Sequence, residues 1–307
     1  MIEVTGVSKS FGNIKAVDSL SFKIRDGEIV GLLGPNGAGK TTTMRIMTGF
    51  LSSDTGRVAI NGIDILESPI EALKDIGYMP EGNPLYKEML VSEMLEFAAN
   101  VRGLLSEEKK EGIEFAIDST AISDVYHRPI AELSKGYRQR VGMALVLLHK
   151  PSVLILDEPT EGLDPNQRSE IRSLIRKLSK GHTVIISTHV MQEVEAVCNR
   201  IILIDRGRLV ADGTPAKLKR EAGKGSGLRM IIEGNKVYEL LRKIEGVSEV
   251  SIIKKRGKKL DLSLTTSKVD ISPQPQISRL AARNGWIIWE LKEIEKNLEE
   301  VFQELTK

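Results

Sequence analysis

The sequence is poor in cysteine, with Cys198 the one example among 307 residues. A single cysteine excludes an intrachain disulfide, and such scarcity is typical of a reducing compartment. Cys198 lies in MQEVEAVCNR, which has the apolar spacing of an amphipathic helix. Because a free cysteine is usually buried and inert, we expect a structural thiol there.

Long apolar runs are also missing from the sequence. The longest, VLIL at 153–156 and RIILI at 200–204, have the length of strands, whereas a membrane-spanning helix needs about 18 or more apolar residues. The first residues, MIEVTGVSKSF, lack the basic and apolar regions of a signal peptide. We therefore expect that this chain does not cross a membrane by itself, and that any role at a membrane depends on a partner.

A strong excess of either charge is absent as well. The 44 Lys and Arg residues nearly balance the 42 Asp and Glu residues, which gives a formal net charge of +2. Nucleic-acid partners are usually bound by strongly basic proteins or faces, so the composition favours no nucleic-acid partner. The length is sufficient for about two domains.

Strands alternate with helices over most of the chain. Apolar runs at 28–34, 153–158 and 182–189 have the pattern of buried strands, and a strand pair with a turn follows at 200–210. Residues 166–180 have the periodicity of an amphipathic helix. This alternation predicts an α/β fold with a largely parallel central sheet.

The strongest local motif is GPNGAGKT at 34–41, which matches the phosphate-binding pattern GxxxxGK[ST] between a strand and a helix. Glycines let backbone amides turn toward phosphates, and the following helix adds its positive N-terminal dipole. We expect Lys40 to contact the β- and γ-phosphates and the hydroxyl of Thr41 to bind Mg²⁺. The expected nucleotide contacts along this loop are Gly34, Pro35, Asn36, Gly37, Ala38, Gly39, Lys40, Thr41 and Thr42.

Two further apolar strands end in groups suited to this chemistry. VLILDEPT places Asp157 and Glu158 at a strand end, where ligands bind in such sheets. Asp157 is expected to anchor Mg²⁺, and Glu158 to accept a proton from an attacking water. His189 ends HTVIISTH and is expected to contact a γ-phosphate. The alternative for the acidic pair is an ordinary strand-to-turn boundary, and a lone histidine is more often structural.

The segment LSKGYRQRV at 133–141, followed by VLILDEPTEGLDP and STH, resembles the ATP-binding domains of the ABC superfamily. The resemblance covers roughly residues 1–215 and implies a P-loop cassette with a mixed core sheet, an antiparallel β subdomain and a helical subdomain. It also implies that Ser134 and Gly136 act on ATP held by a second subunit, with Asp164 at the dimer seam. The implied small molecules are ATP and Mg²⁺.

The sequence departs from the usual family pattern at several positions. Lys135 and Tyr137 replace the more usual Gly and Gln of the signature, and Glu81 replaces the usual Gln of the switch loop. A carboxylate is a good ligand for a hard cation, so Glu81 is expected to reach the metal. Phe11 stands where an aromatic residue stacks on adenine, although it could instead be a core residue.

The stretch IGYMPEGNPLY and the ending LEEVFQELTK resemble ATPases of ABC-2-type exporters, among them the gliding-motility, drug and polysaccharide systems. The resemblance implies an ATPase subunit that drives transport, most readily export, through an integral membrane permease. It would work as a homodimer, in the cytoplasm on the inner face of the cell membrane. Two alternatives are a soluble ABC-type ATPase acting on ribosomes or protein assembly, and a scaffold that binds ATP without turnover.

The expected domain organisation has three parts. An ATP-binding domain spans 1–218, with a helical subdomain at about 84–150, and a linker of small and charged residues follows at 219–227. Residues 228–307 read as a small β-α-β-β-α-β domain with an added final helix near 298–306.

Three features have two interpretations each. Pro84, Leu85 and Tyr86 could contact the membrane subunit or pack within the helical subdomain. The basic run at 254–259 could be a solvated hairpin tip or contact anionic lipid head groups. Trp286 and Trp289 should face opposite sides of a strand, in core or interface packing rather than a ligand site.

Overall fold

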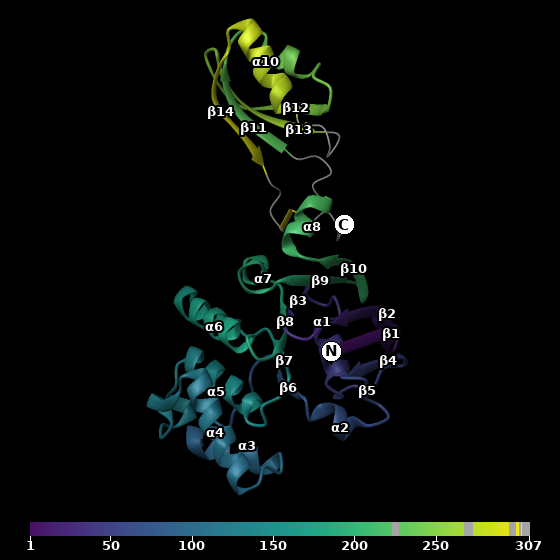
Figure 1. Ribbon diagram of the computed structural model, residues 1–307, viewed down its shortest axis with the longest axis vertical. Helices are drawn as coiled ribbons and strands as arrows, with labels where there is room; N and C mark the ends of the chain where they lie inside the picture. Colours follow the sequence, from purple (N-terminus) through teal and green to yellow (C-terminus); the bar gives the residue numbers. More distant parts are fainter. Residues whose placement is uncertain (223–226, 267–272, 295–298, 301, 303–307) are drawn as a thin grey trace. The chain divides into compact units, whose positions relative to one another are not determined.

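The computed structural model describes residues 1–222, 227–266, 273–294, 299, 300 and 302. The chain divides into two compact units, Met1–Thr214 and Pro215–Lys307 (Figure 1). The predicted fold class is confirmed, because the first unit is an α/β structure with a mixed sheet, an antiparallel sheet and a helical segment.

A six-stranded sheet forms the centre of the first unit, in the order β10-β9-β3-β8-β7-β6. Every pair is parallel except the pairing of β10 with β9, so the sheet is mixed. All residues of β7 are buried, as expected for a parallel strand covered on both faces. The strands are β3 (Ile29–Leu33), β6 (Ile76–Met79), β7 (Val153–Asp157), β8 (Thr183–Thr188), β9 (Arg200–Asp205) and β10 (Arg208–Gly213).

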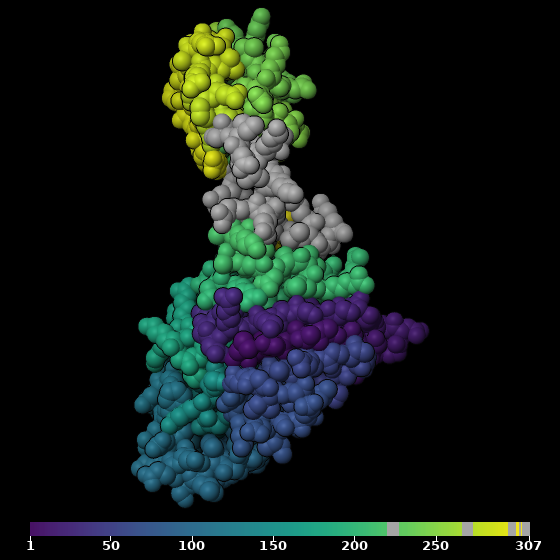
Figure 2. Space-filling model, turned by 45° about the vertical axis from the view of Figure 1, so that its right-hand side comes forward, coloured from purple at the N-terminus to yellow at the C-terminus, as the bar shows by residue number. Residues whose placement is uncertain are grey.

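An antiparallel sheet in the order β2-β1-β4-β5 packs beside the central sheet. Apolar side chains of both sheets and of the first helix, such as Leu20, Met44 and Ile155, share one core. Figure 2 shows the N-terminal strands in purple as a continuous band on one side of this unit. The bounds are β1 (Ile2–Phe11), β2 (Ile14–Ile24), β4 (Thr55–Ile60), β5 (Ile63–Asp64) and α1 (Lys40–Met47).

One helix of the first unit has clear local signals at both of its ends. In α6 (Pro165–Leu178) Asp164 accepts hydrogen bonds from the Asn166 and Gln167 amides, proline takes the first position, and the last turn is basic. A helical segment lies between β6 and β7, and its first helix begins at Val91, later than expected. The other helices are α2 (Pro69–Leu73), α3 (Val91–Val101), α4 (Ser106–Thr120), α5 (Lys135–Leu147), α7 (Met191–Val197) and two 3₁₀ turns, Ser123–Val125 and Ile130–Glu132.

The second unit contains a four-stranded antiparallel sheet in the order β12-β13-β11-β14. Its elements follow one another as β-α-β-β-α-β, as predicted, and they enclose a core of their own that includes Met230, Leu262 and Trp286. Trp289 is 58% exposed, so the two tryptophans do differ in environment. The bounds are β11 (Gly227–Glu233), α9 (Val237–Leu241), β12 (Val247–Arg256), β13 (Lys259–Thr266), α10 (Gln274–Asn284) and β14 (Ile287–Ile294).

The expected linker at 219–227 is corrected in part. Helix α8 spans Pro215–Ala222, β11 begins at Gly227, and 223–226 lie outside the described residues. The unit boundary also falls after Thr214 rather than at 218. The residue types of α8, among them lysine, leucine, arginine, glutamate and alanine, are good helix formers. The final helix expected at 298–306 lies mostly outside the described residues.

The cysteine and the apolar segments of the sequence can be compared with the structure. Cys198 is free and buried, and burial raises the pKa of its thiol to about 12. No helix in the described part of the chain combines the length and the apolar character needed to span a bilayer.

Because all strands of the first two sheets precede Thr214, the chain truncated after Thr214 should unfold cooperatively on heating. Truncation after Arg206 should instead lower the melting temperature strongly. It removes β10 together with Asp212, which accepts two 2.7 Å hydrogen bonds from Arg200. Circular dichroism melts of both truncated chains check this, and aggregation of the longer one would contradict it.

Candidate functional site

The loop between β3 and α1 has a backbone that favours glycine. Gly37 and Gly39 have φ angles of 80° and 102°, in the left-handed region. A Cβ atom on Gly39 would lie 2.4 Å from the carbonyl oxygen of Ala16, and one on Gly34 would lie 2.3 Å from that of Ile204. The glycines therefore allow both the turn of the loop and its close packing against neighbouring strands.

Lys40 begins α1 and is only 7% exposed. Its ammonium group donates hydrogen bonds to the carbonyl oxygens of Gly34 at 2.7 Å and Pro35 at 3.2 Å. Burial lowers the pKa of Lys40, whereas the charges of Glu158, Asp157 and Glu81 act to raise it. The ammonium is thus held by backbone carbonyls inside the loop. The nearby carboxylates act on it through their charge.

The ends of β7 and β8 form a small buried network. The Ser187 hydroxyl donates to Oδ1 of Asp157 and accepts a 2.9 Å hydrogen bond from the backbone N–H of Glu158. Glu158 has a φ of 48°, which is strained for a residue other than glycine. Oδ2 of Asp157 is buried and has no hydrogen-bond partner. Ser187 therefore fixes a strained backbone that directs Glu158 away from the strand.

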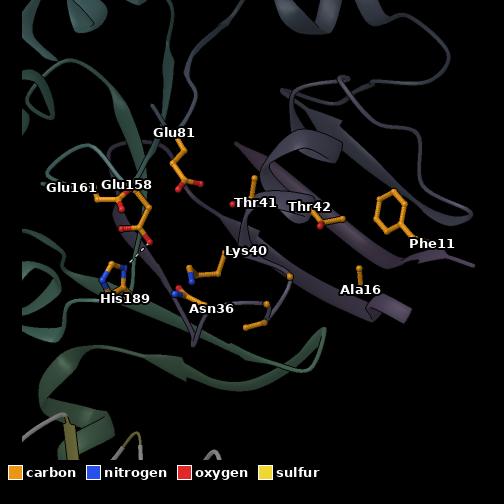
Figure 3. Close-up of a pocket in the computed structure, with 13 residues that line it drawn as sticks. Phe11, Ala16, Asn36, Lys40, Thr41, Thr42, Glu81, Glu158, Glu161 and His189 are labelled. Atoms are coloured by element: carbon orange, nitrogen blue, oxygen red, sulfur yellow. Dashed lines mark hydrogen bonds and ion pairs between the residues drawn. The ribbon is translucent and has the colours of Figure 1, made fainter. Parts of the chain in front are cut away.

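The side chains of Glu158 and His189, which follow β7 and β8, contact each other next to this network. Nδ1 of His189 lies 3.1 Å from Oε1 of Glu158, as the dashed line in Figure 3 shows. Burial raises the pKa of Glu158, and the hydrogen bond and charge of His189 oppose that shift. A carboxylate with a raised pKa is a stronger base, so this group is suited to accept a proton.

A cleft of about 430 Å³ brings most of these groups together. Figure 3 shows Lys40, Glu81, Glu158 and His189 around one end of it and Phe11 toward the other end. Phe11 is 51% exposed, so its ring is not a core residue. The lining residues are Phe11, Ala16, Asn36, Gly37, Ala38, Gly39, Lys40, Thr41, Thr42, Glu81, Glu158, Glu161 and His189.

Sequence reasoning missed two residues of the cleft. Glu161 lies in the turn after β7, and its place among acidic residues near a strand end was the available signal. Ala16 belongs to β2, which approaches the loop only through the tertiary fold, so no local pattern could indicate it. Gly34, Pro35 and Asp157 are not among the lining residues, although the first two hold Lys40.

Three predicted residues lie away from the cleft, at the beginnings of two helices. Ser134 precedes α5 and its hydroxyl accepts a 3.3 Å hydrogen bond from the Tyr137 amide. Gly136 is buried in the first turn of α5, and Asp164 precedes α6. None of the three lines the cleft of their own subunit.

The groups near the cleft fit a magnesium ion that is bound together with phosphates. Among the described residues, no three His, Cys, Asp or Glu side chains are grouped to hold a metal. Mg²⁺ is commonly held by one or two carboxylates and a hydroxyl, with substrate phosphates and waters completing an octahedron. The unpartnered Oδ2 of Asp157 and the side chains of Thr41 and Glu81 supply such oxygens.

Comparison with known proteins identifies the family. Residues 17–161 match the family model described as ABC transporter. The Bacillus subtilis (strain 168) protein YhcH, an uncharacterized ABC transporter ATP-binding protein, is 36% identical over 313 residues, which cover 100% of this chain and 96% of that protein. The chain belongs to the ABC transporter family. It is an ATP-binding subunit of such a transporter and an ATPase.

Other relatives and structures agree with this assignment. The linearmycin resistance ATP-binding protein LnrL of Bacillus subtilis (strain 168) is 32% identical over 255 residues, covering 82% of each chain. The dimeric structure of MJ0796, a bacterial ABC transporter cassette, matches with a TM-score of 0.63 and 25% identity, covering 70% of this chain and 98% of that one. The ADP conformation of the cassette MJ1267 matches with a TM-score of 0.65 and 27% identity, covering 71% and 92%. ABC transporter ATP-binding subunits dimerise and work with membrane components.

Replacing Ser187 with alanine should destabilise the protein by about 1–3 kcal/mol, because a buried carboxylate oxygen and a buried amide each lose a partner. Chemical denaturation with urea measures this change. The exposed Ser173 on α6, whose hydroxyl donates to the Ser169 carbonyl, is the matched control, and Ser173→Ala should change stability by about 0.5 kcal/mol or less. Equal effects of the two substitutions would refute the role of Ser187.

Proposed function

We propose that this chain hydrolyses ATP as a homodimer on the cytoplasmic face of the cell membrane, and so drives export through a separate integral membrane permease. The observation that carries the proposal is the cleft where Lys40 at the phosphate loop faces the paired Glu158 and His189. Export is supported by the relative named for linearmycin resistance and by the probable multidrug ATP-binding protein YbhF. The chain spans only 38% of the latter protein.

In the proposed complex, ATP lies along the cleft with its adenine on the ring of Phe11. The amides of residues 36–42 face the phosphates, and Lys40 turns from the loop carbonyls to the β- and γ-phosphate oxygens. Thr41, Asp157 and Glu81 would hold Mg²⁺, which neutralises charge on the phosphates when bound. The buried ammonium of Lys40 would thereby exchange two neutral carbonyl partners for negatively charged phosphate oxygens.

Glu158 is the proposed general base. It accepts one proton from a water whose oxygen attacks the γ-phosphorus, while the bond from that phosphorus to the bridging oxygen breaks. The products are ADP, which keeps the bridging oxygen, and inorganic phosphate, which keeps the water oxygen. His189 orients Glu158 and contacts the γ-phosphate, since its ring lies within 3.1 Å of the carboxylate.

The position of Ser134, Gly136 and Asp164 supports action on a second subunit. They begin α5 and α6, whose N-terminal dipoles attract anions. In the proposed homodimer, these helix ends complete the site around ATP bound to the partner. The γ-phosphate then joins the two subunits, and its removal releases them.

The residues proposed to contact the permease lie just after β6. Tyr86 is 57% exposed, and its ring packs edge-to-face with Phe97, itself 43% exposed, at 5.8 Å. Pro84 is also exposed and Leu85 is half-buried. An exposed aromatic pair beside the switch loop is a suitable surface for a helix of the membrane subunit.

Replacing Lys40 with alanine should weaken ATP binding by roughly 100-fold or more, because charge-assisted hydrogen bonds to the phosphates are lost. Equilibrium binding of a fluorescent ATP analogue measures the affinity. Lys23→Ala, which removes an exposed ammonium paired with Glu3, is the control and should bind normally. Unchanged affinity in the Lys40 variant would refute the proposed phosphate contact.

Replacing Glu158 with glutamine should lower turnover by about 10²–10⁴-fold, the usual effect of losing a general base. The variant should still bind ATP and should accumulate as an ATP-bound dimer, which size-exclusion chromatography with light scattering detects. Glu161→Gln removes a carboxylate from the same cleft and should have a much smaller effect. Normal hydrolysis by the Glu158 variant, or a strictly monomeric ATP-bound form, would overturn the proposal.

A further inference from the structure

A second cavity, of about 230 Å³, adjoins the nucleotide cleft. The two share Glu158 and Glu161 as lining residues. The rest of the second cavity is lined by the loop after β6, through residues 82–87, and by the first turns of α5. A group that leaves the cleft past the two carboxylates would therefore enter this cavity.

Three basic side chains line this cavity: Lys87, Lys135 and Arg138. The Arg138 guanidinium donates a 2.5 Å hydrogen bond to the carbonyl oxygen of Leu133, which fixes its position. Within the described part of the chain, the ammonium groups of Lys87 and Lys135 make no hydrogen bond or ion pair. Their charges are available to an anion.

Gln139 adds a buried polar group to the same cavity. It is only 6% exposed, and its Oε1 has no hydrogen-bond partner. A buried amide oxygen without a partner costs about 1–3 kcal/mol, so Oε1 of Gln139 indicates a missing hydrogen-bond donor. A side-chain amide offers both N–H donors and an oxygen acceptor, and a half-turn about its last bond exchanges them. It can therefore bind a protonated oxyanion.

We infer that this cavity receives inorganic phosphate as it leaves the nucleotide cleft, an inference that rests on the proposed hydrolysis. Phosphate carries about one to two negative charges at neutral pH. The cavity has room for it, since a water molecule occupies roughly 30 Å³ in the liquid. ADP remains on the phosphate loop, so the two products separate.

The charges that line the two cavities favour passage of an anion in this direction. The nucleotide cleft has three carboxylates, Glu81, Glu158 and Glu161, and Lys40 as its lysine. The second cavity shares two of those carboxylates and adds three cationic side chains. Phosphate that reaches the boundary is therefore attracted toward the second cavity.

The loop after β6 controls the shape of the cavity. Nδ2 of Asn83 donates a 2.7 Å hydrogen bond to the carbonyl oxygen of Arg138 on α5. The Asn83 amide also packs on Gly142, where a Cβ atom would lie 2.3 Å from Oδ1. The loop is thus fastened to α5, and its movement would open the cavity and release phosphate.

The test separates bond cleavage from phosphate release in a single turnover of the intact protein. Acid quench measures ATP cleavage, and a fluorescent phosphate-binding protein measures free phosphate. Lys87→Gln combined with Lys135→Gln should leave cleavage within about twofold and slow release roughly tenfold, because two attractive charges are lost. Lys74→Gln combined with Lys110→Gln removes two exposed charges elsewhere and should change neither rate.

Lys135 follows the signature residue Ser134, so an effect on the ATP-bound dimer must be distinguished. Lys87→Gln alone leaves the signature intact and should slow phosphate release by a smaller factor than the double substitution. Lys135→Arg keeps the positive charge, so it should release phosphate faster than Lys135→Gln and close to the parent rate. Release that remains as fast as in the parent overturns the inference. A parallel loss of cleavage also overturns it, because the residues then act on the chemical step. Absence of cleavage in the parent protein would instead refute the proposed function.

Discussion

The parallel pairing of β3, β8 and β7 is the constraint on which the site depends. The register places Leu33 beside Thr188 and Asp157 beside Ser187, so the three strands end at nearly the same level. The phosphate loop, the acidic pair and the histidine all follow directly from those ends. A shift of one residue would turn every side chain to the other face and separate these groups. The buried apolar core of the sheet therefore positions the chemistry as well as stabilising the fold.

The same arrangement leaves the cleft short of positive charge. Glu81, Glu158 and Glu161 line it, whereas Lys40 is its single lysine or arginine among the described lining residues. Adding a triphosphate would increase the repulsion, since two like charges about 4 Å apart interact with roughly 4 kcal/mol at a protein surface. Tight binding therefore requires cations or dipoles from elsewhere. In the proposed complex, a magnesium ion and the helix ends of a second subunit supply them, and this would link occupancy of the site to assembly for an electrostatic reason.

The sequence was sufficient wherever function depends on a continuous segment. The phosphate loop, the Asp157–Glu158 strand end and the succession of elements along the second unit all follow from local patterns with strict steric or periodic requirements. The sequence was less informative where contacts come from distant segments. Ala16 reaches the cleft only because β2 passes over the loop, and Glu161 was hidden in an ordinary turn. Part of the expected linker was wrong for another reason: α8 has eight residues, fewer than the roughly 11–18 over which apolar periodicity is judged.

The two unusual charges of the chain lie on opposite sides of Glu158. Glu81, in place of the usual glutamine, lines the nucleotide cleft, and Lys135, in place of the usual glycine, lines the adjoining cavity. Together they leave the net charge unchanged but make the cleft more negative and the cavity more positive. An anion freed from ADP therefore experiences an electrostatic force directed from the cleft toward the cavity. In this chain, the departures that make ATP harder to hold are those that would make phosphate easier to expel.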